Sequence, residues 1–229
     1  MKVLSLSIAS LITAASAFAQ SSEKTKSAAA SANFPPVGDI HAHVCGIHFY
    51  SGNISRQIIA EHYCAHLSDE VLQCIIYDSN KPGARLIGVE YIVSAKIFDS
   101  LPPDEKKLWH SHNYEVKSGV LTALGMTDAA EKDLMKVLIG TYGKTWHTWQ
   151  VDRGDKLPMG IPQLMMAFTA DGQAKANIIA ERDKLYGASA AKKTARTDIA
   201  DAKLDSGADG WQKGAAVQLD LKTVQATTQ

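Results

Sequence analysis

Three runs rich in Ile, Val, Tyr and Cys follow one another closely, and they restrict the fold more than any other feature of this sequence. The runs cover Gln57 to Leu67, Val71 to Asp78 and Arg85 to Ser94. β-branched and aromatic residues favour strands, and the short polar connections between the runs suit antiparallel neighbours. The region therefore predicts an antiparallel meander.

Helical patterns and two further strands follow the meander. In chain order, we expect a helix that opens at Pro102 and runs through Trp109, a helix from Asp128 to Ile139, strands from Lys144 to Val151 and from Gln163 to Ala170, and a helix from Ala174 to Tyr186. Proline suits a first helical turn, and Asp128 with Glu131 resembles a capping box. We therefore expect an α+β fold, with a mainly antiparallel sheet and a few helices in a single compact domain.

The first residues predict export. Lys2 precedes an uncharged apolar run that ends in Ala17-Phe18-Ala19, which is typical of a secretory signal with an A-x-A cleavage site. We expect residues 1–19 to be a signal peptide and the mature protein to be secreted or periplasmic. Residues 20–36 are rich in Ser, Ala and Lys and predict a flexible leader.

The remaining chain divides into a domain and a tail. The domain is expected to cover residues 37–187. Residues 188–229 are rich in Ala, Lys and Asp and contain few large apolar side chains. They predict a loosely packed tail that docks through Trp211.

Charge and hydropathy exclude several partners. The 229 residues include 24 Lys+Arg and 24 Asp+Glu, so the chain lacks the basic surplus of a nucleic-acid-binding protein. No stretch after the signal approaches the length of a bilayer span, so we expect no transmembrane segment after cleavage.

Cys45, Cys64 and Cys74 lie close together in the sequence. An exported protein meets oxidising conditions, which favours one disulfide with one thiol left over. All three pairings stay open at this point, as does the alternative of three small buried thiols.

All eight histidines lie between residues 41 and 147, and most occur at short, regular spacing. The groups are His41-Ala-His43-Val-Cys45, His62-Tyr-Cys64-Ala-His66, His110-Ser-His112 with Glu115 after it, and His147 between two tryptophans. Alternate residues of a strand share a face, and so do helical residues four apart. Each of the first three groups therefore offers several ligands from one element.

Imidazole and thiolate are ligands that Zn, Cu and Fe prefer, so the histidine groups predict a transition-metal site. The predicted ligands are His110, His112, His62, His66 and His147. Glu115 is the candidate acid or base of such a site. No catalytic residue beyond this candidate is indicated.

Three alternatives to this site stay open. The histidines could hydrogen-bond separately within a core that holds no metal, or Cys64 could form a nucleophilic pair with His62 or His66. The third alternative is a cupin, whose first motif His110-x-His112 resembles. That match is imperfect, because only two residues separate His112 from Glu115, and a regular strand would turn this carboxylate to the opposite face.

Several long strings also carry a resemblance. They include Cys45-Gly-Ile-His-Phe-Tyr-Ser-Gly, His62-Tyr-Cys-Ala-His, Gln73-Cys-Ile-Ile-Tyr-Asp-Ser-Asn-Lys-Pro-Gly-Ala-Arg and Leu108-Trp-His-Ser-His-Asn-Tyr-Glu-Val-Lys-Ser-Gly. Through these strings the chain resembles the oil-body-associated protein family, over residues 37 to 187 and again at Asp209-Gly-Trp211. The resemblance implies an association with seed oil bodies for the plant members and supplies no catalytic mechanism.

Two functions follow as hypotheses. The first is an exported protein that contacts a lipid or envelope surface, or a small-molecule ligand, through its Trp- and Met-rich strands. The second is a histidine-rich metalloprotein or metalloenzyme. They differ in one observable feature, which is whether the histidines converge on a single point.

Overall fold

The computed structural model describes residues 34–214 and 216–227. The predicted signal peptide and most of the predicted leader lie outside the described residues. Tertiary contacts separate the residues up to Asp39, which include the short 3₁₀ helix η1 (Val37–Asp39), from a compact unit that begins at Ile40.

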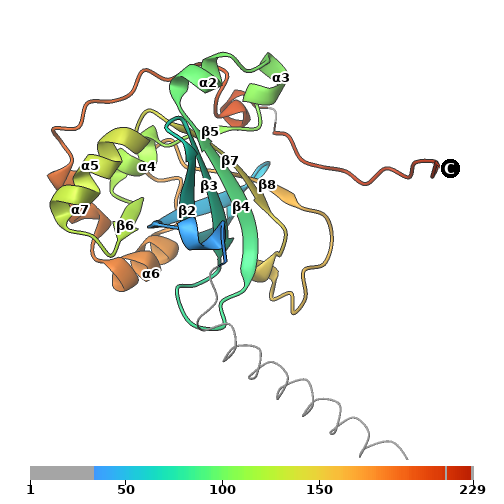
Figure 1. The fold of residues 1–229 in the computed structure, drawn as a ribbon, viewed down its shortest axis with the longest axis horizontal. Helices are drawn as coiled ribbons and strands as arrows, with labels where there is room; N and C mark the ends of the chain where they lie inside the picture. The colour runs from blue at the N-terminus through green and yellow to red at the C-terminus, as the bar shows by residue number, and fades with distance from the viewer. Residues whose placement is uncertain (1–33, 215, 228–229) are drawn as a thin grey trace, which may run out of the picture. The chain divides into compact units, whose positions relative to one another are not determined.

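Six strands of this unit form a closed antiparallel barrel (Figure 1). They are β1 (Ala42–Tyr50), β2 (Asn53–Ser68), β3 (Val71–Tyr77), β4 (Leu86–Val93), β7 (Tyr142–His147) and β8 (Gln163–Met166). The order around the barrel is β2-β3-β4-β7-β8-β1, and β1 pairs with β2 again to close it. Two short strands extend the sheet: β5 (His110–Ser111) pairs with β7, and β6 (Thr122–Leu124) pairs with β1.

The helices lie in the connections after β4 and in the segment that follows the last strand, β8. They are α2 (Ala95–Asp99), α3 (Pro103–Lys106), α4 (Asn113–Ser118), α5 (Asp128–Leu138), α6 (Ala176–Tyr186) and α7 (Ser189–Ala195), with 3₁₀ helices η2 (Val151–Arg153) and η3 (Gly210–Lys213). Side-chain caps explain two starts, because Ser94 accepts from the N–H of Ile97 and Thr127 from that of Ala130. Within the described residues, every helix is too short or too polar to span a bilayer.

The predicted fold class and meander are confirmed. β2, β3 and β4 pair in sequence, with Cys74 opposite both Cys64 and Glu90. The predicted strand from Lys144 to Val151 is wrong at its end, because β7 stops at His147 and the chain then turns into η2. β8 likewise stops at Met166, before the expected Ala170.

The cysteine pairing that the sequence left open is between Cys64 and Cys74. These residues face each other on β2 and β3, with their Cα atoms 4.1 Å apart. Cys45 is buried and is the free thiol among the described residues.

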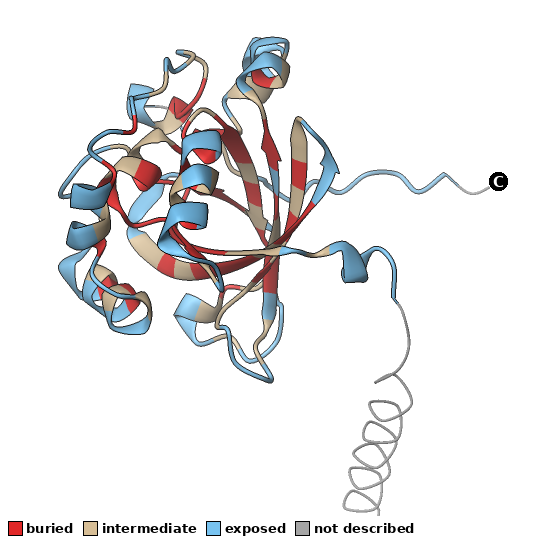
Figure 2. Cartoon of the chain, turned by 60° about the vertical axis from the view of Figure 1, so that its left-hand side comes forward, coloured by how far each residue is buried: buried red, intermediate tan, exposed pale blue. Residues whose placement is uncertain are grey.

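The inside of the barrel is apolar at most positions and polar along one level. Alternate residues of a strand share a face, so β2 directs Ala60, His62 and Cys64 to the same side, and β4 does the same with Glu90 and Ile92. Figure 2 shows the buried residues gathered along these strands. Both His62 and Glu90 are buried between apolar neighbours on their own strands.

The segment after Gly187 contains more ordered contacts than the expected loose tail. Trp211 packs edge-on against Phe49, with ring centroids 4.9 Å apart, so the expected docking residue does contact the core. Further along, the Gln218 side chain donates to the carbonyls of Ser51 and Leu164.

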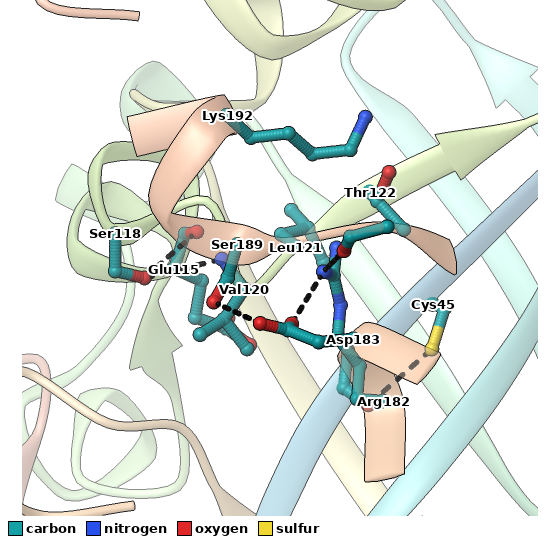
Figure 3. Close-up of polar contacts among 12 residues, drawn as sticks. Cys45, Glu115, Ser118, Val120, Leu121, Thr122, Arg182, Asp183, Ser189 and Lys192 are labelled. Carbon is teal, nitrogen blue, oxygen red and sulfur yellow. Dashed lines mark hydrogen bonds and ion pairs between the residues drawn. The ribbon is translucent and has the colours of Figure 1, made fainter. Parts of the chain in front are cut away.

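Buried ion pairs hold α7 against the barrel. The Glu131 carboxylate accepts from Thr122 and from the backbone of Ala123, and it pairs with Lys192 and Arg196. We call Glu131, Thr122, Lys192 and Arg196 the Glu131 cluster. Next to it, Asp183 accepts from the hydroxyl of Ser189 and from Arg182, as Figure 3 shows.

Candidate metal centre

The carboxylate of Glu90 lies on the inner face of the barrel, and four imidazoles approach it. Their Nε2 atoms lie at four distances from its nearer oxygen: 2.9 Å for His62, 3.2 Å for His112, 3.5 Å for His48 and 3.6 Å for His110. All five residues are almost completely buried, with at most 4% exposure. We call these five residues the Glu90 cluster.

The cluster gathers side chains from five elements. His48 comes from β1, His62 from β2 and Glu90 from β4, all on strands that the barrel closure brings together. His110 lies on β5, and His112 occupies the N-cap position of α4.

A glycine on β7 makes this convergence possible. A Cβ added at Gly143 would lie 2.2 Å from Oε1 of Glu90 and 2.6 Å from Nε2 of His110. No side chain fits at that distance, so any other residue would push Glu90 or His110 aside.

Hydrogen bonds outside the cluster orient two of the imidazoles. Nδ1 of His62 lies 3.2 Å from the carbonyl of Val44 and 3.1 Å from that of Ala60, so it carries the proton. Nδ1 of His112 lies 2.8 Å from Oγ1 of Thr141. Because the Thr141 hydroxyl donates to the carbonyl of Leu138, it accepts from His112. In the neutral form, both imidazoles therefore direct an Nε2 lone pair at Glu90.

A residue far along the chain, Asp209, fixes the segment that carries His110 and His112. Between the two histidines, Ser111 donates from its backbone N–H and its hydroxyl to the Asp209 carboxylate, at 3.0 and 2.7 Å. The N–H of Asp209 in turn donates to the carbonyl of Trp109. Asp209 adopts a left-handed backbone, with φ of 51°, where this three-way contact is made.

The electrostatic surroundings keep Glu90 ionised. Burial alone would raise the pKa of Glu90, but the close imidazoles of His110, His112 and His62 hold it well below its ordinary value. Burial lowers the pKa of His48 strongly and also that of His112. Burial also acts to lower the pKa of His62 and of His110. The nearby Glu90 carboxylate outweighs this effect, so the pKa of each of these two histidines is raised.

Glu115 approaches the cluster from α4. It is 1% exposed, and one of its oxygens lies within 4.8 Å of ring nitrogens of His110 and His112. The expectation that a strand would turn this carboxylate away is wrong, because Glu115 lies in the first turn of a helix, which places it on the same side as His112. Burial raises the pKa of Glu115 to about 8, with the Glu90 charge adding to this effect and His110 opposing it.

Several buried polar atoms around the cluster lack a hydrogen-bond partner within the described part of the chain. They are Nε2 of His62, both ring nitrogens of His110, Oε1 of Glu115 and Nδ1 of His147. Nε2 of His62 is close to Glu90 but does not have the geometry of a hydrogen bond. Buried polar atoms are normally satisfied, so this concentration points to a ligand.

A small cavity borders the cluster and has a volume of about 30 Å³. His48, His62, Glu90, His112 and Glu115 all border it, but almost entirely through their carbon atoms. Its remaining wall is mostly apolar and includes Leu72 of β3, Ile92 of β4, and Leu134 and Leu138 of α5.

The structure brings together three of the five histidines predicted as ligands: His62, His110 and His112. His147 lies outside the cluster but contacts one of its members, with its Nε2 3.4 Å from Nδ1 of His48. His66 lies outside the cluster, on the exposed end of β2, where it stacks against His41 at 5.0 Å.

Sequence reasoning missed His48 and Glu90 as members. Glu90 is the one acidic residue in the apolar run from Leu86 to Val93, which is a signal that could have identified it. His48 belongs to none of the closely spaced histidine groups, and its contact with Glu90 depends on closure of the barrel.

Comparisons with known proteins agree with the resemblance. The family model described as "Protein of unknown function (DUF1264)" matches residues 34–200. Oil body-associated protein 1B of Arabidopsis thaliana is 52% identical over 163 residues, which are 71% of this chain and 67% of that protein. Oil body-associated proteins 1A and 2A of Zea mays are 49% and 45% identical, over 68% and 84% of this chain and 66% and 79% of their own lengths. No solved structure matches. This chain therefore belongs to the DUF1264 family, together with the oil body-associated proteins.

Proposed function

We propose that this protein binds a transition-metal ion through the Glu90 cluster. The observation that carries the proposal is the approach of four imidazole Nε2 atoms to one buried carboxylate, at 2.9 to 3.6 Å. The Glu90 carboxylate has no proton to donate to the Nε2 lone pairs that face it. A cation between these atoms would therefore satisfy both the carboxylate and the imidazoles.

The spacing of the donor atoms suits a metal ion. Two ligands at about 2.1 Å from one ion lie roughly 3 to 4 Å from each other, depending on the angle between them. The atoms of His48, Glu90 and His110 all lie within 4.8 Å of one another, which a small contraction would bring into this range. Imidazole with carboxylate suits Zn, Cu or Fe.

The orienting hydrogen bonds provide further support. Metal-bound histidines commonly donate their other ring N–H to a carbonyl or a similar acceptor, which fixes the tautomer. His62 does this with Val44 and Ala60, and His112 does it with Thr141. Gly143 leaves the room that the metal ligands require.

The test is the metal content of purified protein, loaded separately with Zn, Cu and Fe(II) and then desalted. We expect about one ion per chain for the wild type and none for His112→Ala. The matched control is His66→Ala, which removes a predicted ligand from the exposed end of β2, outside the cluster. It should retain the metal.

Two results would overturn the proposal. One is a wild-type protein that retains none of the three metals. The other is a folded His112→Ala protein that retains as much metal as His66→Ala does. Circular dichroism of both variants establishes that each is folded.

We further propose that the protein acts after export, at a lipid or envelope surface. The apolar run before Ala19 supports export, and so does the Cys64–Cys74 disulfide, since disulfides persist in oxidising compartments. The names of the oil body-associated relatives support a lipid surface. Exposed Leu157 and Met159, in the connection between η2 and β8, are apolar groups that such a surface would cover.

Two measurements test this second proposal. The intact mass of protein recovered outside the cytoplasm should correspond to cleavage after Ala19. Flotation with phospholipid vesicles should carry the wild type upward and leave a Leu157→Lys, Met159→Lys variant behind. An uncleaved chain, or equal flotation of both proteins, would contradict the proposal.

A further inference from the structure

We propose that residues 217–225 form a β-strand that pairs antiparallel with the same segment of a second copy of this chain. We call these residues the C-terminal arm. The proposal does not depend on the metal site or on a lipid surface. It rests on the residue pattern of the arm, on the exposure of its apolar side chains and on the charges that would face each other.

The C-terminal arm has the residue pattern of a strand but no partner strand. Val217, Leu219 and Leu221 alternate with polar residues, which is the period of a half-buried strand. In the part of the chain that the structure describes, residues 216–227 lie in no strand or helix, and their backbone makes no hydrogen bond to another backbone group. An extended segment of this kind can pair with another chain.

The start of the arm is fixed to the barrel. Val217 packs against the core cluster that contains Phe49 and Leu164. The side-chain amide of Gln218 donates to the carbonyls of Ser51 and Leu164, and its oxygen accepts from the N–H of Leu164. Because these contacts already order the start of the arm, pairing of the remaining residues costs less conformational entropy.

Beyond this start, the apolar side chains of the arm are exposed. Leu219 is 46% exposed, Leu221 79% and Val224 74%. Leu221 and Val224 are more exposed than any other large apolar side chain among the described residues. Single exposed apolar side chains are ordinary, but a row of them on an anchored, extended segment indicates a surface that another molecule covers.

The charges of the arm favour a second copy of this chain, in one antiparallel register. When Leu221 faces Leu221 of the second copy, Asp220 faces Lys222 on both sides of the two-fold axis. A shift of one residue places the apolar row opposite the polar row. A shift of two residues, or a parallel pairing in register, places like charges opposite each other. The arm is therefore complementary to itself in this arrangement.

The same register brings the leucines of the two arms together. Alternate residues of a strand share a face, so Leu219 and Leu221 of both copies lie on the side that continues from Val217. Leu221 faces its counterpart, and Leu219 lies diagonal to Leu221 of the second copy, within reach of contact. Two strands alone are marginally stable in water, so we expect a dimer that dissociates on dilution.

The experiment measures the mass of the protein in solution by sedimentation equilibrium, from about 1 µM to about 1 mM, the range in which weak interfaces dissociate. We expect the wild type to approach twice the mass of one chain at the upper end. Leu221→Asp places two carboxylates at the centre of the pairing and should stay monomeric throughout. The matched control is Leu67→Asp, which changes a leucine that is 67% exposed near the end of β2. It should dimerise like the wild type.

Exchange of the two charges tests the register. Asp220→Lys and Lys222→Asp each place like charges opposite each other, so each should raise the dissociation constant of the dimer about tenfold. An equimolar mixture of these two variants should dimerise as the wild type does, because each copy then meets the opposite charge at both positions. Circular dichroism establishes that every variant is folded.

Three results would overturn the proposal. One is a wild type that is monomeric over the whole range, and if vesicle flotation of this monomer is lost in Leu221→Asp, the arm contacts lipid instead. Another is a Leu221→Asp protein that dimerises like the wild type, which would place the interface elsewhere. The third is a mixture of the charge variants that is no more dimeric than either variant alone, which would exclude this register.

Discussion

Two groups of buried charges in this protein are built differently. In the Glu131 cluster, the carboxylate accepts from a hydroxyl and a backbone N–H and pairs with Lys192 and Arg196. Arg196 also donates to the carbonyls of Val116 and Leu121. In the Glu90 cluster, by contrast, Nε2 of His62 and both ring nitrogens of His110 have no hydrogen bond among the described residues.

This contrast in hydrogen bonding indicates that the Glu131 cluster serves the structure and that the Glu90 cluster serves a function. The Glu131 cluster shows that the chain can satisfy a buried carboxylate completely where it serves only to join α5, α7 and β6. Leaving polar atoms unsatisfied costs stability, so the gaps around Glu90 require another explanation. The two clusters also differ in the type of basic side chain. A buried histidine can lose its proton and become a neutral ligand, whereas an arginine stays charged.

The largest effect is expected from Glu90→Gln, which should remove all bound metal. The amide keeps the shape of the side chain but loses the charge on which four imidazoles converge. Metal analysis after reconstitution measures the loss. The matched control is Glu61→Gln, which changes a carboxylate that is equally buried but is bound by His43 and Tyr186 instead. Loss of metal in both variants would count against a specific role for Glu90.

Next in size, Arg196→Met should lower the free energy of unfolding by about 3–5 kcal/mol, because it leaves Glu131 buried with only one cation. Urea unfolding of the metal-free protein measures this change. The control is Lys136→Met, which removes an exposed ion pair between Lys136 and Asp133, one turn apart on α5. This variant should change the free energy of unfolding little. If the two variants were equally stable, the Glu131 cluster would not have the structural role described above.

A smaller effect is expected from Thr141→Val, which removes the acceptor of the His112 Nδ1 proton. Removing an orienting partner of this kind typically weakens metal binding by about 10- to 100-fold. Competition with a chelator measures the affinity. Thr141→Ser keeps the hydroxyl and should bind nearly as tightly as the wild type. A Val variant with wild-type affinity would show that Thr141 does not orient His112 for a metal.

The smallest effect concerns acid stability. Burial alone would raise the pKa of Glu131, but Lys192, Thr122 and Arg196 lower it below its ordinary value of 4.5. A carboxyl whose pKa is lowered by folding contributes stability above its unfolded pKa and loses it as the pH falls through the folded pKa. The stability difference between the wild type and Glu131→Gln should therefore shrink between about pH 5 and pH 3. A difference that stays constant over this range would contradict the assignment.

The sequence predicts elements better than it predicts the site. The meander from Gln57 to Ser94 and the helix from Asp128 follow from local patterns, and both are present in the structure. Spacing alone cannot place His66, because four residues along a strand extend about 13 Å, which carries His66 away from His62. Local patterns are equally unable to join His48 to Glu90, because that contact depends on closure of the barrel.

The position of Glu115 also could not be predicted from local sequence patterns. Its distance from His112 suits a helix and not a strand, and the sequence did not indicate where the strand ends. His112 begins α4, and this single change of backbone decides whether Glu115 faces the cavity or turns away from it. The resemblance to a family could not settle this point, because it carries no site residues.

The link between Ser111 and Asp209 has a consequence for the order of biogenesis. Asp209 lies 98 residues beyond Ser111 and holds it between the two histidines His110 and His112. A ribosome therefore releases every donor of the Glu90 cluster well before it makes the residue that fixes two of them. A nascent chain therefore has no finished Glu90 cluster during translation. For the metal proposed above, insertion is expected to be a late maturation step that is sensitive to loss of the segment around Asp209.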